Sequence, residues 1–145
     1  MSKNFQFEKN IEGEVSAFLV SKGLKAYPTF GMVELAENNI QVAFEYGGIL
    51  DTGRQVLNNQ FEYDLHEGQV MIQVQTYREN DLLHHERIGK VRANMINGVN
   101  GFTSNQYEIF DIQPQASSTI QNEENNLDQT TLMFQITFKL DHTKT

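Results

Sequence analysis

The sequence predicts an α+β domain with a mainly antiparallel sheet of about five to six strands and two helices packed on one face. Three observations support this prediction. Apolar residues recur every three to four positions near residues 5–22 and 81–97, as on the buried face of a helix. They recur at every second position in several other segments, as in strands with one buried face. Links of hairpin length join the middle strands, which favours antiparallel neighbours.

The first predicted helix covers about residues 5–22, and Gly23 is expected at its C-cap. Its apolar stripe consists of Phe7, Ile11, Val15, Phe18 and Leu19. After a loop, Val33 and Leu35 indicate a short strand. A clearer strand follows at residues 40–46, where apolar and polar residues alternate, and it is expected to break at Gly47–Gly48.

Residues 49–60 are predicted to form an excursion between strands, with a turn at Asn58–Asn59. Two alternating segments come next, at residues 61–65 and 70–74. The sequence "HEG", residues 66–68, separates them and contains a glycine, so we expect a hairpin here.

The second helix is expected to begin at Asn80 or Asp81 and to end near Asn97–Gly98. A strand is predicted at 107–112, followed by a polar loop or arm at about 113–131. The last element, residues 132–140, alternates without interruption and is predicted to be a central strand. All these elements fit a single domain over residues 1–145.

Composition excludes several classes of chemistry. The absence of cysteine excludes disulfides, thiolate nucleophiles and thiolate metal sites. The net charge of −8 opposes broad binding to nucleic-acid phosphates. The sequence has no apolar run of the roughly 20 residues that cross a bilayer, and the N-terminus lacks the apolar core of a signal peptide. We therefore expect a protein made in a cytosol, with no membrane partner.

The histidines do not form a metal-binding pattern. His84 and His85 are adjacent, which on a helix places their side chains about 100° apart, unlike a chelating pair one turn apart. We expect one to pack its ring and the other to face water. His66 and His142 could join a site only through the fold. No catalytic, cofactor or metal residues are therefore predicted.

Other catalytic motifs are equally weak. The triplet "DTG", Asp51–Gly53, matches the aspartic-protease triplet but lacks that family's downstream elements, and it is interpreted as a turn. No serine sits in a G-x-S-x-G elbow, and the glycines near residue 48 precede no G-K-[ST]. The sequence therefore does not predict an enzyme.

The order of elements and three stretches, "VQTYREND", "HHERIGKVRANM" and "LMFQITFKL", resemble tail terminator or tail completion proteins of tailed bacteriophages. The resemblance covers most of the chain, from about Asn4 to Leu140. It implies a structural virion protein of the tail or neck, made in the bacterial host cytoplasm. Such subunits form a homo-oligomeric ring, expected to be a hexamer, that caps the tail tube and joins it to the head.

The resemblance implies two kinds of partner besides the other copies, the tail tube protein and the head–tail connector proteins. No cofactor and no specific nucleic-acid binding are implied, beyond surrounding a DNA channel. The expected contacts with a neighbouring subunit or the tail lie in the excursion, beside and on the second helix, and in the polar arm. They are Asp51, Arg54, Gln55, Arg78, Arg87, Gln115 and Gln121.

Two alternatives remain open from the sequence. The chain could be another neck or tail subunit, such as a head completion or tail tube protein, which would also form a ring. It could instead be a small-molecule-binding or enzymatic α+β domain that uses Arg78 and the histidines of the second helix. A ring in solution would support a virion component, and a monomer with a deep polar pocket would support the second alternative.

Overall fold

A computed structural model describes residues 7–28, 40–52, 63–77, 81–96, 108–123 and 127–141. The elements follow in the order α1 (Phe7–Ser21), β1 (Ala26–Pro28), β2 (Ile40–Thr52), β3 (Tyr63–Tyr77), α2 (Asp81–Ile96), β4 (Glu108–Asn122) and β5 (Leu127–Asp141). The predicted α+β class is confirmed. The predicted strand at Val33 and Leu35 and most of the predicted excursion lie outside the described residues.

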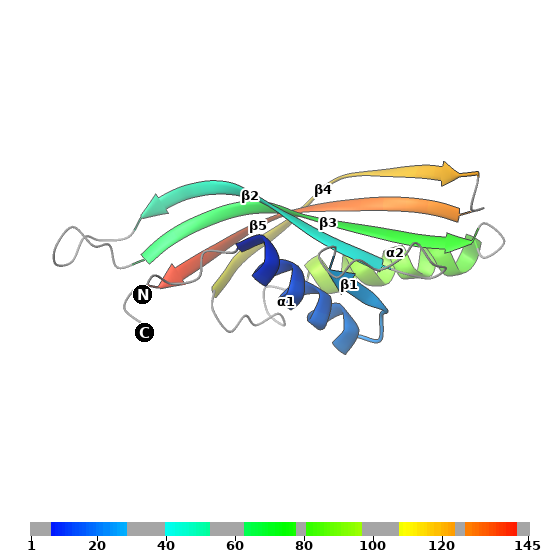
Figure 1. Cartoon of the computed structure of the whole chain (residues 1–145), viewed down its shortest axis with the longest axis horizontal. Helices are drawn as coiled ribbons and strands as arrows, with labels where there is room; N and C mark the ends of the chain where they lie inside the picture. Colours follow the sequence, from blue (N-terminus) through cyan, green and yellow to red (C-terminus); the bar gives the residue numbers. More distant parts are fainter. Residues whose placement is uncertain are drawn as a thin grey trace.

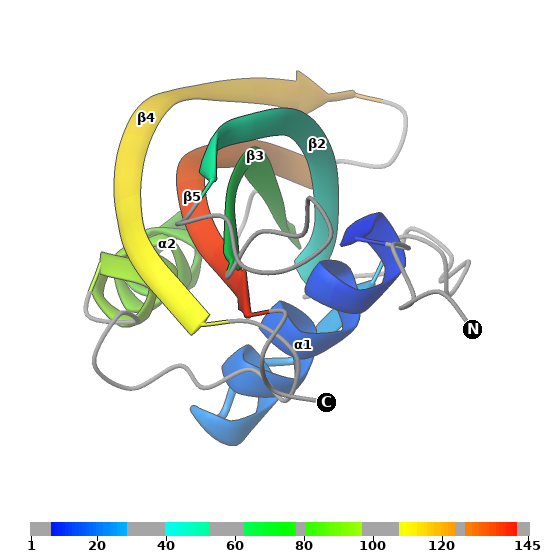
Figure 2. The ribbon, with the colours of Figure 1, turned by 90° about the vertical axis from the view of Figure 1, so that its left-hand side faces the viewer.

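The strands form one sheet in the order β1-β2-β3-β5-β4 (Figure 1). Only β1 and β2 run parallel, and the other neighbours are antiparallel. The last strand, β5, lies between β3 and β4, so residues 132–140 occupy the central position that their uninterrupted alternation predicted. Viewed from one end, the sheet is strongly twisted (Figure 2).

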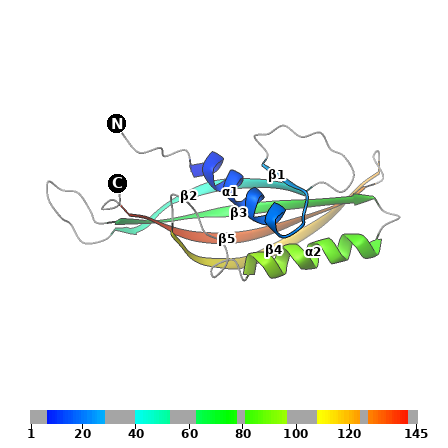
Figure 3. The ribbon, with the colours of Figure 1, turned by 90° about the horizontal axis from the view of Figure 1, so that it is seen from below.

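Both helices cover the same face of the sheet, as predicted (Figure 3). Helix α1 packs on β1 and β2, and α2 packs on β3, β4 and β5. Alternate residues of the long strands point at the helices and are buried, as the period of two requires. The core between the layers includes Ile11, Val15, Leu19, Val42, Ile72, Val74, Ile88, Val91, Met95, Phe134, Ile136 and Phe138. The opposite face is called the open face below.

The end of α1 shows why a glycine follows it. Gly23 has a φ of 86°, in the left-handed region that favours glycine. Its N–H donates to the carbonyl of Val20, and the N–H of Leu24 donates to the carbonyl of Leu19. These two bonds form a Schellman motif, which satisfies carbonyls that the last helical turn would leave unbonded. The predicted C-cap is confirmed.

The predicted hairpin at residues 66–68 is wrong, because β3 runs without interruption from Tyr63 to Tyr77. Gly68 serves a close contact there instead of a turn. A Cβ atom built on it would lie 2.2 Å from Cζ of Phe44 and 2.7 Å from the carbonyl oxygen of Glu45. Only glycine leaves room for the Phe44 ring on the neighbouring strand.

The predicted break at Gly47–Gly48 is also wrong, because β2 continues to Thr52. The pairing with β3 shifts by one residue between Tyr46 and Gly48, which defines a β-bulge. Gly48 has a φ of 122°, a conformation that L side chains rarely adopt. The glycine pair therefore bends the strand instead of ending it.

The predicted polar arm at 113–131 is a pair of strands. Residues up to Asn122 belong to β4, and β5 begins at Leu127. This part of β4 forms the edge of the sheet, and its side chains from Gln113 to Gln121 are exposed. Alternating hydrophobicity marks a strand only when one face is buried, so an edge strand that is wet on both faces resembles a loop in sequence.

Candidate interaction surface

The structure describes the side chains of three of the seven predicted contact residues. Gln115 and Gln121 are exposed on β4. Arg87 is buried, with 7% of its surface exposed. Asp51 lies in β2, but its side chain is outside the description, as are the whole residues Arg54, Gln55 and Arg78. The two glutamines are therefore the described candidates that lie on the surface.

Arg87 bonds inside the subunit, contrary to its expected place on an exposed helix face. Its Nη1 donates to the carbonyl oxygen of Gln75 at 2.7 Å and to Oγ1 of Thr76 at 2.8 Å. Burial lowers the pKa of its guanidinium, because desolvation disfavours the charged form. Its role in the described structure is to attach α2 to β3, which removes it from the surface candidates.

His84 continues the same buried cluster. Its Nδ1 lies 2.8 Å from Oγ1 of Thr76 on β3, and its Nε2 lies 2.8 Å from Oγ1 of Thr130 on β5. Thr130 in turn bonds to Thr119 of β4 at 2.9 Å. The two ring nitrogens thus connect α2 with β3 and β5, and Thr130 extends the cluster to β4. His85 is exposed, so the prediction of one packed and one solvated histidine is confirmed.

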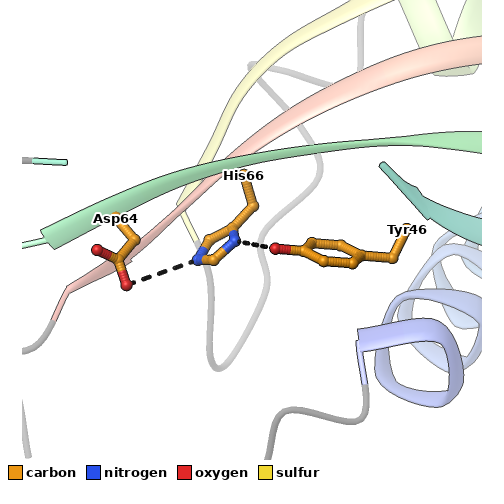
Figure 4. Close-up of polar contacts among 3 residues, drawn as sticks. All are labelled: Tyr46, Asp64 and His66. Atoms are coloured by element: carbon orange, nitrogen blue, oxygen red, sulfur yellow. Dashed lines mark hydrogen bonds and ion pairs between the residues drawn. The ribbon is translucent and has the colours of Figure 1, made fainter. Parts of the chain in front are cut away.

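A second buried histidine lies on β3 (Figure 4). Nδ1 of His66 is 2.7 Å from the hydroxyl of Tyr46, and its Nε2 is 3.9 Å from Oδ2 of Asp64, which is longer than a hydrogen bond. The imidazole is 2% exposed and stacks on the ring of Phe138, with 5.3 Å between centroids. This packing fixes the histidine as part of the core and keeps its ring away from solvent.

The open face carries a chain of amide hydrogen bonds across three strands. Nε2 of Gln69 donates to Oε1 of Gln115 at 2.8 Å. Nε2 of Gln115 donates to Oε1 of Gln135 at 3.3 Å, and Nε2 of Gln135 donates to Oε2 of Glu67 at 2.8 Å. These residues, with Glu45, border a shallow depression of about 240 Å³. Its lining includes carboxylates and amides but no Lys, Arg or His side chain. The depression therefore suits a ligand that donates hydrogen bonds.

The two edges of the sheet differ. On one edge, β1 pairs with residues 40–42 of β2, and the next stretch of β2 is covered by α1. There the carboxylate of Glu12 accepts a hydrogen bond from the backbone N–H of Phe44 at 3.0 Å. On the other edge, β4 pairs only with β5 among the described strands. Among the described strands, the short strand β1 is therefore outermost at one edge and the long strand β4 is outermost at the other.

Exposed apolar side chains occur on both sides of the molecule. Val20, Tyr27 and Ile49 belong to α1, β1 and β2, on the β1 side of the sheet. Leu82, Leu83, Ile96 and Ile120 belong to α2 and β4, at the opposite edge. These exposed apolar side chains therefore lie on two different parts of the surface.

Two other features are absent from the part of the chain that the structure describes. Among the residues that the structure describes, no group of three or more His, Asp or Glu side chains could hold a metal ion. Within the same residues, no helix is long and apolar enough to cross a membrane.

Two features were not predicted from the sequence. They are the chain of amide hydrogen bonds on the open face and the threonines that surround His84. Glutamine does recur on β3 at residues 69 and 73, which share one face of the strand and are partly exposed. That signal could have identified the open face. The threonines are spread over three strands and carry no such pattern.

Comparison with known proteins gives a likeness of fold. The sequence matches no protein-family model and no curated protein. The structure is similar to a chain in the virion of a native gene transfer agent particle, with a TM-score of 0.59. The alignment covers 86% of this chain and 84% of that chain, at 10% sequence identity. At this identity the likeness establishes a shared fold over nearly the whole length of both chains.

Proposed function

We propose that this chain is a structural subunit of a virion, and that it forms the ring of a tail terminator or tail completion protein. The observation that carries the proposal is the fold shared with a chain of the gene transfer agent virion over most of both lengths. The resemblance of the sequence to tail terminator and tail completion proteins points the same way. In this role the ring caps the tail tube and joins it to the head.

The surface of the subunit supports assembly into a ring. A closed ring is built from heterologous contacts, in which two different surfaces of each subunit meet. The exposed apolar residues on α1, β1 and β2 lie at one edge of the sheet, and those on α2 and β4 lie at the other. Neighbours that bring these two edges together would bury both sets. Gln115 and Gln121 lie at the β4 side of this contact.

The histidines support a structural role over a catalytic one. His84 has both ring nitrogens bonded to threonines, and His66 is stacked in the core beside Phe138. His84 connects α2 to β3 and β5, and His66 of β3 packs on Phe138 of β5. A catalytic base must lie within reach of the proton that it abstracts, and in the described structure both rings are buried within their own chain.

Two measurements test the proposal. Negative-stain electron microscopy of the purified chain is expected to show closed rings, with a hexamer as the expected size. Gold-labelled antibodies against the chain are expected to mark the junction of head and tail on purified virions. A protein that stays monomeric at high concentration would contradict the ring. Label elsewhere on the particle would assign the chain to another virion component, and no label on the virion would overturn the proposal.

A further inference from the structure

We propose that the outward face of α2 packs against the same face of α2 in a second copy of this chain, with the two helices antiparallel. Such a contact is isologous, because both copies use the same surface, and it joins subunits in twos. It goes beyond the ring of the proposed function, which is built from contacts between unlike surfaces.

The outward face of α2 has the residue pattern of a helix that packs on another helix. The face that meets the sheet includes the buried residues His84, Ile88, Val91 and Met95. The opposite side of a surface helix normally carries polar and charged residues. Here it consists of five exposed residues, which we call the outer seam: Leu82, Glu86, Gly89, Ala93 and Ile96. Their alternating spacing of four and three is that of a coiled-coil seam, and Glu86 is the only polar member.

The outer seam is apolar at both ends and small in the middle. Leu82 and Ile96 are 73% and 48% exposed. A Cβ built on Gly89 meets nothing within 4 Å, so packing in the described structure gives no reason for a glycine, which destabilises a helix interior. The distance between two packed helices depends on the side chains at their contact. Gly89 and Ala93 therefore allow the close approach of a second helix at the middle of the seam.

The charges on this face complement themselves when the two helices are antiparallel. Glu86 and Lys90 are exposed and one turn apart, so they lie on the same side of α2. In an antiparallel pair that crosses at Gly89, Glu86 of each copy lies two residues, about 3 Å along the axis, from Lys90 of the other. Leu82 of each copy then meets Ile96 of the other. In a parallel pair, Glu86 would face Glu86 and Lys90 would face Lys90, and such like charges repel.

The apolar ends of the seam supply the association, and the charges select the partner and its orientation. Exposed ion pairs add little affinity because solvent screens them, whereas burial of apolar surface is favourable. Leu82 and Ile96 are also among the apolar residues assigned to the ring contact, so a subunit can use them in one contact at a time. Pairing through α2 therefore withholds subunits from the ring, a consequence that rests on the proposed function.

Charge exchange tests both the contact and its orientation. Glu86→Lys leaves two bases at these positions, and Lys90→Glu leaves two acids. Each single variant is expected to form dimers about tenfold more weakly than the wild type in sedimentation velocity, because each change acts twice in a two-fold pair. An equimolar mixture of the two variants is expected to recover wild-type dimer formation, since every acid again meets a base. The double variant Glu86→Lys/Lys90→Glu is expected to pair with itself as the wild type does.

Glu45→Lys is the matched control, because it makes the same change of charge at an exposed position on the open face. It is expected to form dimers as the wild type does. All three positions are exposed, so circular dichroism should show folded protein for every variant. The proposal would be overturned by a wild type that forms no dimer, by Glu86→Lys dimers as stable as those of Glu45→Lys, or by a mixture that recovers nothing.

The results also separate this inference from the proposed function. Dimers that depend on Glu86 and Lys90, in a protein that never forms rings, would support pairing through α2 and contradict the ring. Rings that form equally in all variants, with no dimer at any concentration, would support the proposed function and refute the pairing.

Discussion

Gly68 shows how one missing side chain fixes the distance between two strands. The ring of Phe44 occupies the space in which a Cβ of residue 68 would lie, and the carbonyl of Glu45 closes the same space from the backbone side. We predict that Gly68→Ala lowers the free energy of unfolding by roughly 1 to 3 kcal/mol, the usual cost of overpacking. Urea unfolding of the purified variant measures it.

The matched control for this prediction is Gly89→Ala on α2. A Cβ built on Gly89 meets nothing within 4 Å, and alanine is favoured over glycine inside a helix by roughly 0.5 to 1 kcal/mol. This variant is expected to be more stable than the wild type. If Gly68→Ala also raised the free energy of unfolding, the close approach of Phe44 to Gly68 would not make an added Cβ costly.

The two adjacent histidines are predicted to differ sharply in their contribution to stability. His84→Ala removes two hydrogen bonds to threonines and a buried ring, and should cost roughly 2 to 3 kcal/mol. His85→Ala changes an exposed side chain and should stay within about 0.5 kcal/mol of the wild type. Thermal unfolding of the two single variants tests the contrast, and equal losses would place His85 in the core as well.

Single residues were the hardest scale to predict from sequence. A glycine beside a histidine and a glutamate matches a turn, and only the position of Phe44 on another strand shows that Gly68 makes room for a ring. The burial of Arg87 likewise depends on Gln75 and Thr76, which belong to a different element. Such roles arise from neighbours that are distant in sequence, and one sequence without its fold does not reveal them.

At the scale of elements, β5 is the strand on which the sheet depends. It has strands on both sides, and Phe134 and Phe138 point into the core. We predict that Phe134→Ala costs roughly 3 to 5 kcal/mol, because the cavity that it leaves cannot be filled by its neighbours. Chemical unfolding, or loss of soluble protein, measures the effect.

The neighbouring residue checks the register of that strand. Met133 points to the opposite face and is only partly buried. Its replacement by alanine should cost clearly less than that of Phe134, because fewer of its contacts are lost. A larger loss for Met133→Ala would mean that the faces of β5 are assigned the wrong way round.

Elements with one buried face were predictable, and an element without one was not. Both helices, β5 and the first part of β2 follow clear apolar periods, and the structure contains each of them. The second half of β4 has wet side chains on both faces, so its sequence resembles a loop. Its pairing with β5 is made by backbone hydrogen bonds, which do not depend on residue type. The sequence of this segment therefore gave no sign of a strand, and the predicted arm was wrong.

At the scale of the whole molecule, charge should govern how copies meet. With a net charge of −8, subunits repel one another over distances comparable to the Debye length, which is about 10 Å in roughly 0.1 M salt. We therefore predict that self-association tightens several-fold when salt is raised from about 0.02 M to about 0.5 M. Sedimentation velocity at matched protein concentration measures it. Association that weakens with salt would instead indicate ion pairs between subunits.

The central place of β5 has a consequence for synthesis on the ribosome. Strand β4 emerges before β5, yet β5 separates it from β3, so the nascent β4 has no neighbour within its own sheet until β5 leaves the exit tunnel. The pairing of β4 with the rest of the sheet therefore has to wait for β5, although β3 and α2 precede both strands in the chain.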